Sequence, residues 1–89
     1  MNTPKRKVPA SISHAPIPRT IWLVLFDQHV AARALTARQI ADELAHVGFP
    51  IHTTAQVEPH LRLLLDLKLI RRALPLTRRY EHWRYVIKP

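Results

Sequence analysis

The sequence contains no cysteine, a single glycine and only six acidic residues among its 89. The absence of cysteine excludes disulfides, thiolate zinc sites, iron–sulfur clusters and thiol catalysis, so an apolar core alone must hold the fold together. The longest apolar run, Ile21–Phe26, is far shorter than the roughly 20 residues that cross a bilayer, and we expect no membrane span. Prolines instead of an apolar stretch follow the basic start, which predicts a cytoplasmic, nucleoid-associated protein without a secretory signal.

The charge of the chain is strongly one-sided. Fourteen Lys and Arg against six Asp and Glu give a net charge of +8, which favours a polyanionic partner. The positive charge lies at the two ends, because residues 60–89 alone carry eight of the basic side chains. No Ser/His/Asp set, carboxylate pair or glycine-rich phosphate loop can be assembled, so we expect no enzyme and no cofactor. The six histidines lack the spacing of a metal site, and none is predicted.

The first part of the chain differs in composition from the rest. Residues 1–18 hold four of the eight prolines and few large apolar side chains, which predicts a flexible, basic, proline-rich arm. A folded domain is expected over residues 19–89. Thr20 is the expected N-cap of a first helix that runs through the apolar stretch to about Ala34.

A second helix is indicated from Thr36 to about Ala45. Thr36 and Gln39 have the spacing of a capping box, and Ile40, Leu44 and Val47 form one apolar stripe. Gly48 stands where such a helix ends.

A third helix is expected from Thr53 or Thr54 to about Lys68, with Val57, Leu61 and Leu64 in its apolar stripe. Pro59 lies inside this range, and it either kinks the first turn or moves the start of the helix to Glu58.

The pattern then changes to strands. Residues 70–74 and 80–87 predict two strands joined by a basic turn over residues 75–79, with Trp83, Tyr85 and Ile87 on one face of the second strand. The fold class is therefore mainly α with a small β-hairpin: three helices followed by a two-stranded wing.

This order resembles the winged helix-turn-helix superfamily, and two stretches carry the resemblance. Residues 35–44 look like the second helix common to many of its families. Residues 57–64, followed by Leu69-Ile70-Arg71-Arg72, are similar to the third helix and first wing strand of arsenic-repressor-like (ArsR-like) and MarR-like transcriptional regulators. The resemblance implies double-stranded DNA as partner, the third helix in the major groove, a wing on phosphates and a homodimer.

On this resemblance, Thr54 and Gln56 contact base edges or phosphates, Arg62 contacts a phosphate, and Arg78 and Arg79 form the wing tip. The charge map adds further basic side chains of the arm, the second helix and the wing. The nucleic-acid-binding candidates added in this way are Lys5, Arg6, Lys7, Arg38, Arg71 and Arg72.

Two other functions stay open. The outward face of the third helix is mixed, because Glu58 and Asp66 flank Arg62 at i,i+4 spacing and invite ion pairs along the helix. This face favours a protein-interaction module, such as a phage-like inhibitor or an assembly subunit, that docks through Ala55, Pro59 and Leu63. A basic winged helix of this size is also compatible with RNA binding.

Overall fold

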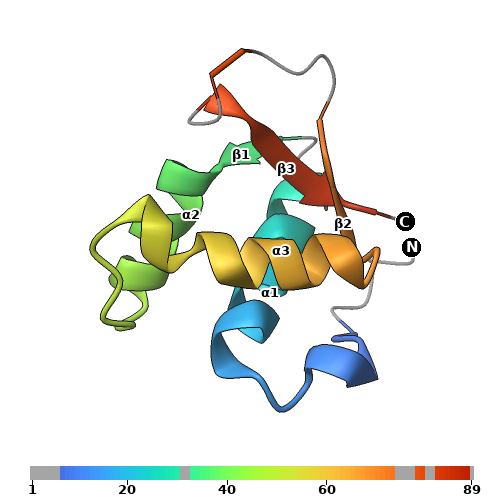
Figure 1. Ribbon diagram of the computed structural model, residues 1–89. Coiled ribbons are helices and arrows are strands. Elements are labelled where there is room, and N and C mark those ends of the chain that lie inside the picture. The colour runs from blue at the N-terminus through green and yellow to red at the C-terminus, as the bar shows by residue number, and fades with distance from the viewer. Residues whose placement is uncertain (1–6, 31–32, 74–77, 80–81, 89) are drawn as a thin grey trace.

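The structure is a computed structural model, which describes residues 7–30, 33–73, 78–79 and 82–88 (Figure 1). It is an α+β fold with three α-helices and a small three-stranded antiparallel sheet. The elements in chain order are the 3-10 helix η1 (Ala10–Ile12), α1 (Pro16–Val30), β1 (Leu35–Thr36), α2 (Ala37–His46), the 3-10 helix η2 (Thr54–Gln56), α3 (Glu58–Asp66), β2 (Ile70–Arg72) and β3 (Arg84–Ile87).

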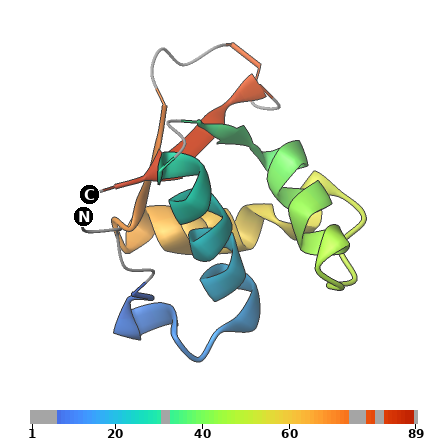
Figure 2. The same cartoon turned by 180° about the vertical axis from the view of Figure 1, so that it is seen from behind.

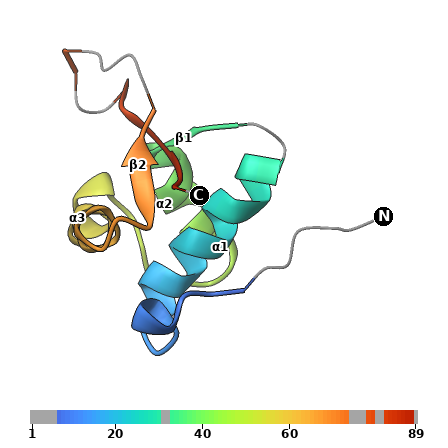
Figure 3. The same cartoon turned by 90° about the vertical axis from the view of Figure 1, so that its right-hand side faces the viewer.

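The three helices and the sheet enclose one apolar core. Figure 3 shows α3 and α1 side by side below the sheet, and Figure 2 shows α1 from behind with α2 beside it. α1 packs against β3, α2 and α3. The most deeply buried side chains come from every one of these layers: Ile12, Ile21, Leu25, Ile40, Leu44, Val57, Leu64 and Ile70. Burial of this apolar surface is the main favourable term in the stability of so small a chain.

The first helix begins at Pro16, and the predicted start at Thr20 is wrong. The hydroxyl of Thr20 does not cap the helix but donates a hydrogen bond of 2.8 Å to the carbonyl oxygen of Pro16, one turn earlier. Proline fits the first turn of a helix because the backbone N–H that it lacks has no partner there. Pro16 and Pro18 therefore belong to the helix.

Residues 10–18, which the sequence analysis assigned to the arm, pack onto the core. Ile12 has an exposed fraction of 0 %, and Pro18 is buried. Arg19 holds this segment in place by donating a hydrogen bond of 3.1 Å to the carbonyl oxygen of Ser13. Of the basic residues expected in the arm, Lys7 is exposed just before η1, and Lys5 and Arg6 lie outside the described residues.

The structure confirms the signals predicted for the two ends of the second helix, but Val47 of the predicted apolar stripe follows the helix and has an exposed fraction of 56 %. The N–H of Gln39 donates to the hydroxyl of Thr36 at 3.2 Å, and the N–H of Thr36 donates to the side-chain oxygen of Gln39 at 2.9 Å. At the other end, Gly48 has a φ of +103°. The N–H groups of Gly48 and Phe49 donate to the carbonyl oxygens of Ala45 and Leu44, which is the Schellman pattern of helix termination.

The third helix begins at Glu58, the second of the two alternatives that Pro59 left open. The preceding residues form the separate 3-10 turn η2, because the ring of Pro59 is tolerated only in the first turn of an α-helix. α3 ends in the same hydrogen-bond pattern as α2, but the left-handed position is occupied by Lys68 with a φ of +60°. A residue other than glycine is strained in this conformation, because its Cβ approaches the backbone too closely.

The sheet has three strands in the order β1-β3-β2, and the expected two-stranded wing was therefore incomplete. The additional strand β1 is only two residues long and pairs Leu35 with Tyr85. On the other side of β3, Ile70 pairs with Ile87 and Arg72 with Tyr85. The predicted alternation along β3 is confirmed, because Tyr85 and Ile87 are buried while Arg84 is exposed.

Candidate nucleic-acid interface

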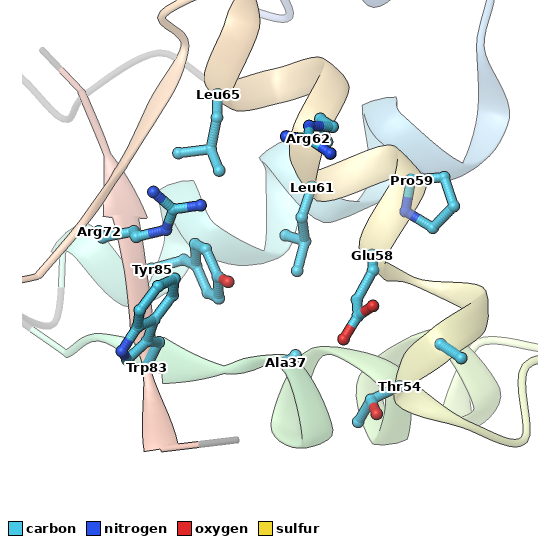
Figure 4. A pocket seen from close by; sticks show the side chains of 11 residues that line it. Ala37, Thr54, Glu58, Pro59, Leu61, Arg62, Leu65, Arg72, Trp83 and Tyr85 are labelled. Carbon is cyan, nitrogen blue, oxygen red and sulfur yellow. The ribbon is translucent and has the colours of Figure 1, made fainter. Parts of the chain in front are cut away.

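An open groove of about 810 Å³ runs between α3 and the sheet (Figure 4). One wall is α3, the other is formed by β2, β3 and Trp83, and the start of α2 and η2 lie at its lower end in that view. The lining residues are Ala37, Thr54, Ala55, Glu58, Pro59, Leu61, Arg62, Leu65, Arg72, Trp83 and Tyr85. The groove thus combines aromatic rings with both signs of charge.

Arg72 is fixed over an aromatic ring at the sheet wall of this groove. Its guanidinium carbon lies 4.6 Å from the ring centroid of Trp83, a cation–π contact. The register explains this contact: Arg72 is paired with Tyr85, and Trp83 lies two residues from Tyr85 on the same face of the chain. The stacked guanidinium keeps its N–H donors at its edge, and the residue is exposed. Arg72 is therefore a pre-positioned donor for an anionic group.

Arg62 and Glu58 face the groove from α3, but they do not pair. The expected ion pairs of Arg62 with Glu58 and Asp66 are absent from the part of the chain that the structure describes, where Arg38 pairs with Asp42 at 3.4 Å. The Glu58 side chain extends toward Ala37 and Thr54 (Figure 4). Glu58 also occupies the first turn of α3, where the helix dipole favours a negative charge. The Glu58 carboxylate is thus stabilised by the helix dipole. The guanidinium of Arg62 is not paired with it and remains available to a ligand.

The structure divides the predicted nucleic-acid-binding residues among several places. Thr54, Arg62 and Arg72 meet in the groove. Arg71 follows Ile70 and precedes Arg72, so it points to the opposite face of the sheet. Arg78 and Arg79 are exposed in the segment between β2 and β3.

Two of the predicted residues are engaged within the fold. Arg38 lies on α2 and pairs with Asp42. The side-chain oxygen of Gln56 accepts hydrogen bonds from the backbone N–H groups of His52 and Thr53, at 2.6 and 3.0 Å. This oxygen therefore stabilises the turn that leads into η2.

The three residues of the predicted protein contact do not form one patch. Ala55 and Pro59 line the groove beside Arg62. Leu63, with an exposed fraction of 41 %, lines a second, almost entirely apolar groove of about 530 Å³ on another side of α3. Its other lining residues are Ala15, Pro16, Ile17, Pro18, Phe49 and His60.

Three further candidate residues, Trp83, Arg84 and Lys88, were not predicted from the sequence. Trp83 could have been found from its spacing, because it lies two residues before the buried Tyr85 and therefore on the same, inward face of the chain. Arg84 and Lys88 lie at the same two-residue spacing on either side of Val86, on the opposite face.

Comparisons with known proteins identify no relative: no family model, curated protein or solved structure matches the chain. Within the described ranges, no three His, Asp or Glu side chains gather as a metal site. None of the helices there combines the length and the apolar character that a bilayer crossing requires. The arrangement of side chains in the groove is thus the basis for a functional proposal.

Proposed function

We propose that this chain is a winged helix-turn-helix protein that binds double-stranded DNA and acts as a small transcriptional regulator in the cytoplasm. Three helices followed by a two-stranded hairpin have the order of that fold, and β1 extends the hairpin to a three-stranded sheet. The net charge of +8 supports a polyanionic partner. In this proposal α3 enters the major groove, and the segment between β2 and β3 is the wing.

The observation that carries the proposal is the convergence of Arg62 and Arg72 on one groove. They belong to different elements, yet both line the space between α3 and the sheet. Arginine binds phosphate through paired N–H donors, and the stacking of Arg72 on Trp83 lowers the entropy lost when it binds. A phosphate strand that follows this groove brings the adjacent bases to Thr54 in η2, just before α3.

The test is the double variant Arg62→Ala, Arg72→Ala, measured by fluorescence anisotropy on a random DNA duplex. Loss of two phosphate contacts should weaken binding on the order of 10-fold at moderate salt and make the slope of log K against log salt about 2 less negative. The matched control is Arg33→Ala, Lys68→Gly, which removes the same charge from two exposed positions outside the groove. Equal losses in both variants would show that net charge alone, and not this groove, binds DNA.

The apolar groove at Leu63 favours the alternative function, a module that docks another protein through α3. Leu63 is a large exposed apolar side chain, of the kind that marks contact surfaces when it lies in a continuous apolar patch. Under this alternative, Leu63→Asp abolishes self-association or partner binding, as measured by sedimentation. Under the DNA-binding proposal, the same variant keeps its duplex affinity, because Leu63 lies outside the groove between α3 and the sheet.

A further inference from the structure

The face of the sheet that points away from the groove carries its own cluster of positive charge. We define the outer sheet face as Thr36, Arg71, Ala73, Arg84 and Val86, extended by Lys88. The register places Arg71 opposite Val86 and Thr36 opposite Arg84. The N–H of Lys88 donates to the carbonyl oxygen of Leu69 at 3.0 Å, so the ladder continues to Lys88.

Three cations therefore surround Val86. Arg71 faces it across the strands, and Arg84 and Lys88 lie two residues before and after it. All three side chains are exposed, and Val86 between them is half-buried. Diagonal neighbours in an antiparallel pair are about 7–8 Å apart, close enough for like charges to repel each other.

Nothing in the described part of the chain neutralises this cluster. No Asp or Glu occupies a described position of the outer sheet face, and no ion pair is formed there by Arg71, Arg84 or Lys88. Repulsion among three cations disfavours the fold, so the cluster is better explained by an external anion than by stability. The two arginines match the paired donors that phosphate accepts.

The outer sheet face cannot share a duplex with the groove between α3 and the sheet. Arg71 and Arg72 are consecutive in β2, so their side chains leave opposite faces of the sheet. A straight duplex docked against α3 and Arg72 lies on one side of the sheet only.

We propose that the outer sheet face binds the phosphates of a second DNA duplex, so that one molecule bridges two duplexes. This inference rests on the proposed DNA-binding function and adds a second surface to it. It predicts that duplex binding and duplex bridging depend on different arginines, with Arg62 and Arg72 required for the first contact and Arg71 and Arg84 for the second.

The test is a bridging assay with the full chain. One biotinylated random duplex is held on streptavidin beads, and recovery of a second, fluorescent duplex is measured as protein is added. The unmodified protein should recover it. Arg71→Ala, Arg84→Ala should reduce recovery at least about 5-fold, while its affinity for a single duplex, measured by anisotropy, changes less than about 3-fold. The control Arg33→Ala, Lys68→Gly should bridge like the unmodified protein.

Each other outcome overturns a defined statement. Tight binding of one duplex without bridging contradicts the second surface and leaves the proposed function intact. Bridging that persists in Arg71→Ala, Arg84→Ala assigns it to self-association and also contradicts the second surface. Equal loss of bridging in the control variant assigns it to net charge. Absence of duplex binding at any salt concentration overturns the proposed function and this inference together.

Discussion

The two faces of the sheet carry arginines in different surroundings. On the groove face, Arg72 is stacked on Trp83 and faces Arg62 and Glu58 across the groove. On the outer sheet face, Arg71 has cations as its neighbours and neither an aromatic ring nor an acid at the paired positions. One peptide bond separates the two arginines. Consecutive basic residues in a strand therefore contribute their charges to two different surfaces of the sheet.

The two surfaces also differ in how closely geometry constrains a ligand. In the groove, the stacked guanidinium and the acid of Glu58 limit where a phosphate strand can lie. On the outer sheet face, the three cations are exposed, and no aromatic ring or acid at the paired positions would restrict the phosphates proposed to bind there. We therefore expect substitutions in the groove to depend on the geometry of the side chain, and substitutions on the outer sheet face to depend on the local charge at those positions.

The largest expected effect comes from the segment that joins β2 to β3. Arg78→Ala with Arg79→Ala removes two exposed cations between β2 and β3. Binding to all duplex sequences should weaken on the order of 10-fold, with a salt dependence about 2 units less steep, since both side chains are proposed to contact phosphates. Anisotropy on two unrelated duplexes measures this, and unchanged affinity would remove the wing from the interface.

A smaller loss is expected when the support of Arg72 is removed. Trp83→Leu keeps an apolar side chain at the groove wall but abolishes the cation–π contact. Duplex affinity should fall about 2- to 5-fold, the equivalent of roughly 0.5–1 kcal/mol at an exposed site. In a double-mutant cycle with Arg72→Ala, the two losses should not add. Additive losses would show that Trp83 acts independently of Arg72.

Substitution of the acidic residue in the groove, Glu58, should change duplex affinity in the opposite direction. Glu58→Gln removes a negative charge beside the proposed phosphate path, so duplex affinity should rise about 2- to 5-fold. Because Glu58 stabilises the first turn of α3, the free energy of unfolding in urea should fall by about 0.3–1 kcal/mol. A decrease in affinity would mean that Glu58 accepts a hydrogen bond from the ligand.

The smallest effect on binding is expected at the end of α3. Lys68→Gly removes one positive charge but relieves the left-handed strain that Gly48 avoids at the end of α2. The free energy of unfolding should rise by about 0.5–1 kcal/mol, while duplex affinity stays nearly constant. If Lys68→Gly weakened duplex binding as much as substitution of a groove arginine, affinity would depend on net charge and not on the position of the cation.

Local signals in the sequence predicted the ends of α2 and left two alternatives for the start of α3, of which Glu58 is the observed one. The capping pair Thr36 and Gln39, the lone Gly48 and the ring of Pro59 each act within one turn of the chain, so sequence alone reveals them. The start of α1 was missed because Pro16 and Pro18 are typical both of disordered segments and of the first helical turn. The burial of Ile12 depends on tertiary contacts that no local pattern contains.

The candidate site was predicted only in part for a similar reason. Arg62 and Thr54, which both line the groove, were predicted from the resemblance, although Thr54 lies in η2 and not on the third helix. The separation of Arg71 from Arg72 follows only from the register of β2 against β3, and the strand β1 is too short to show any periodicity. Ala55 and Pro59 proved to lie apart from Leu63 because they line a different side of α3.

The most direct test of DNA binding is anisotropy of the unmodified protein over a salt series, on random duplex DNA, single strands and structured RNA. We expect the tightest binding to the duplex, with a slope of log K against log salt of roughly −6 if seven basic side chains contact phosphates. These are the side chains of Lys5, Arg6, Lys7, Arg62, Arg72, Arg78 and Arg79. Preference for structured RNA would favour the RNA-binding alternative. Weak binding to every nucleic acid at physiological salt, despite the charge of +8, would contradict the account.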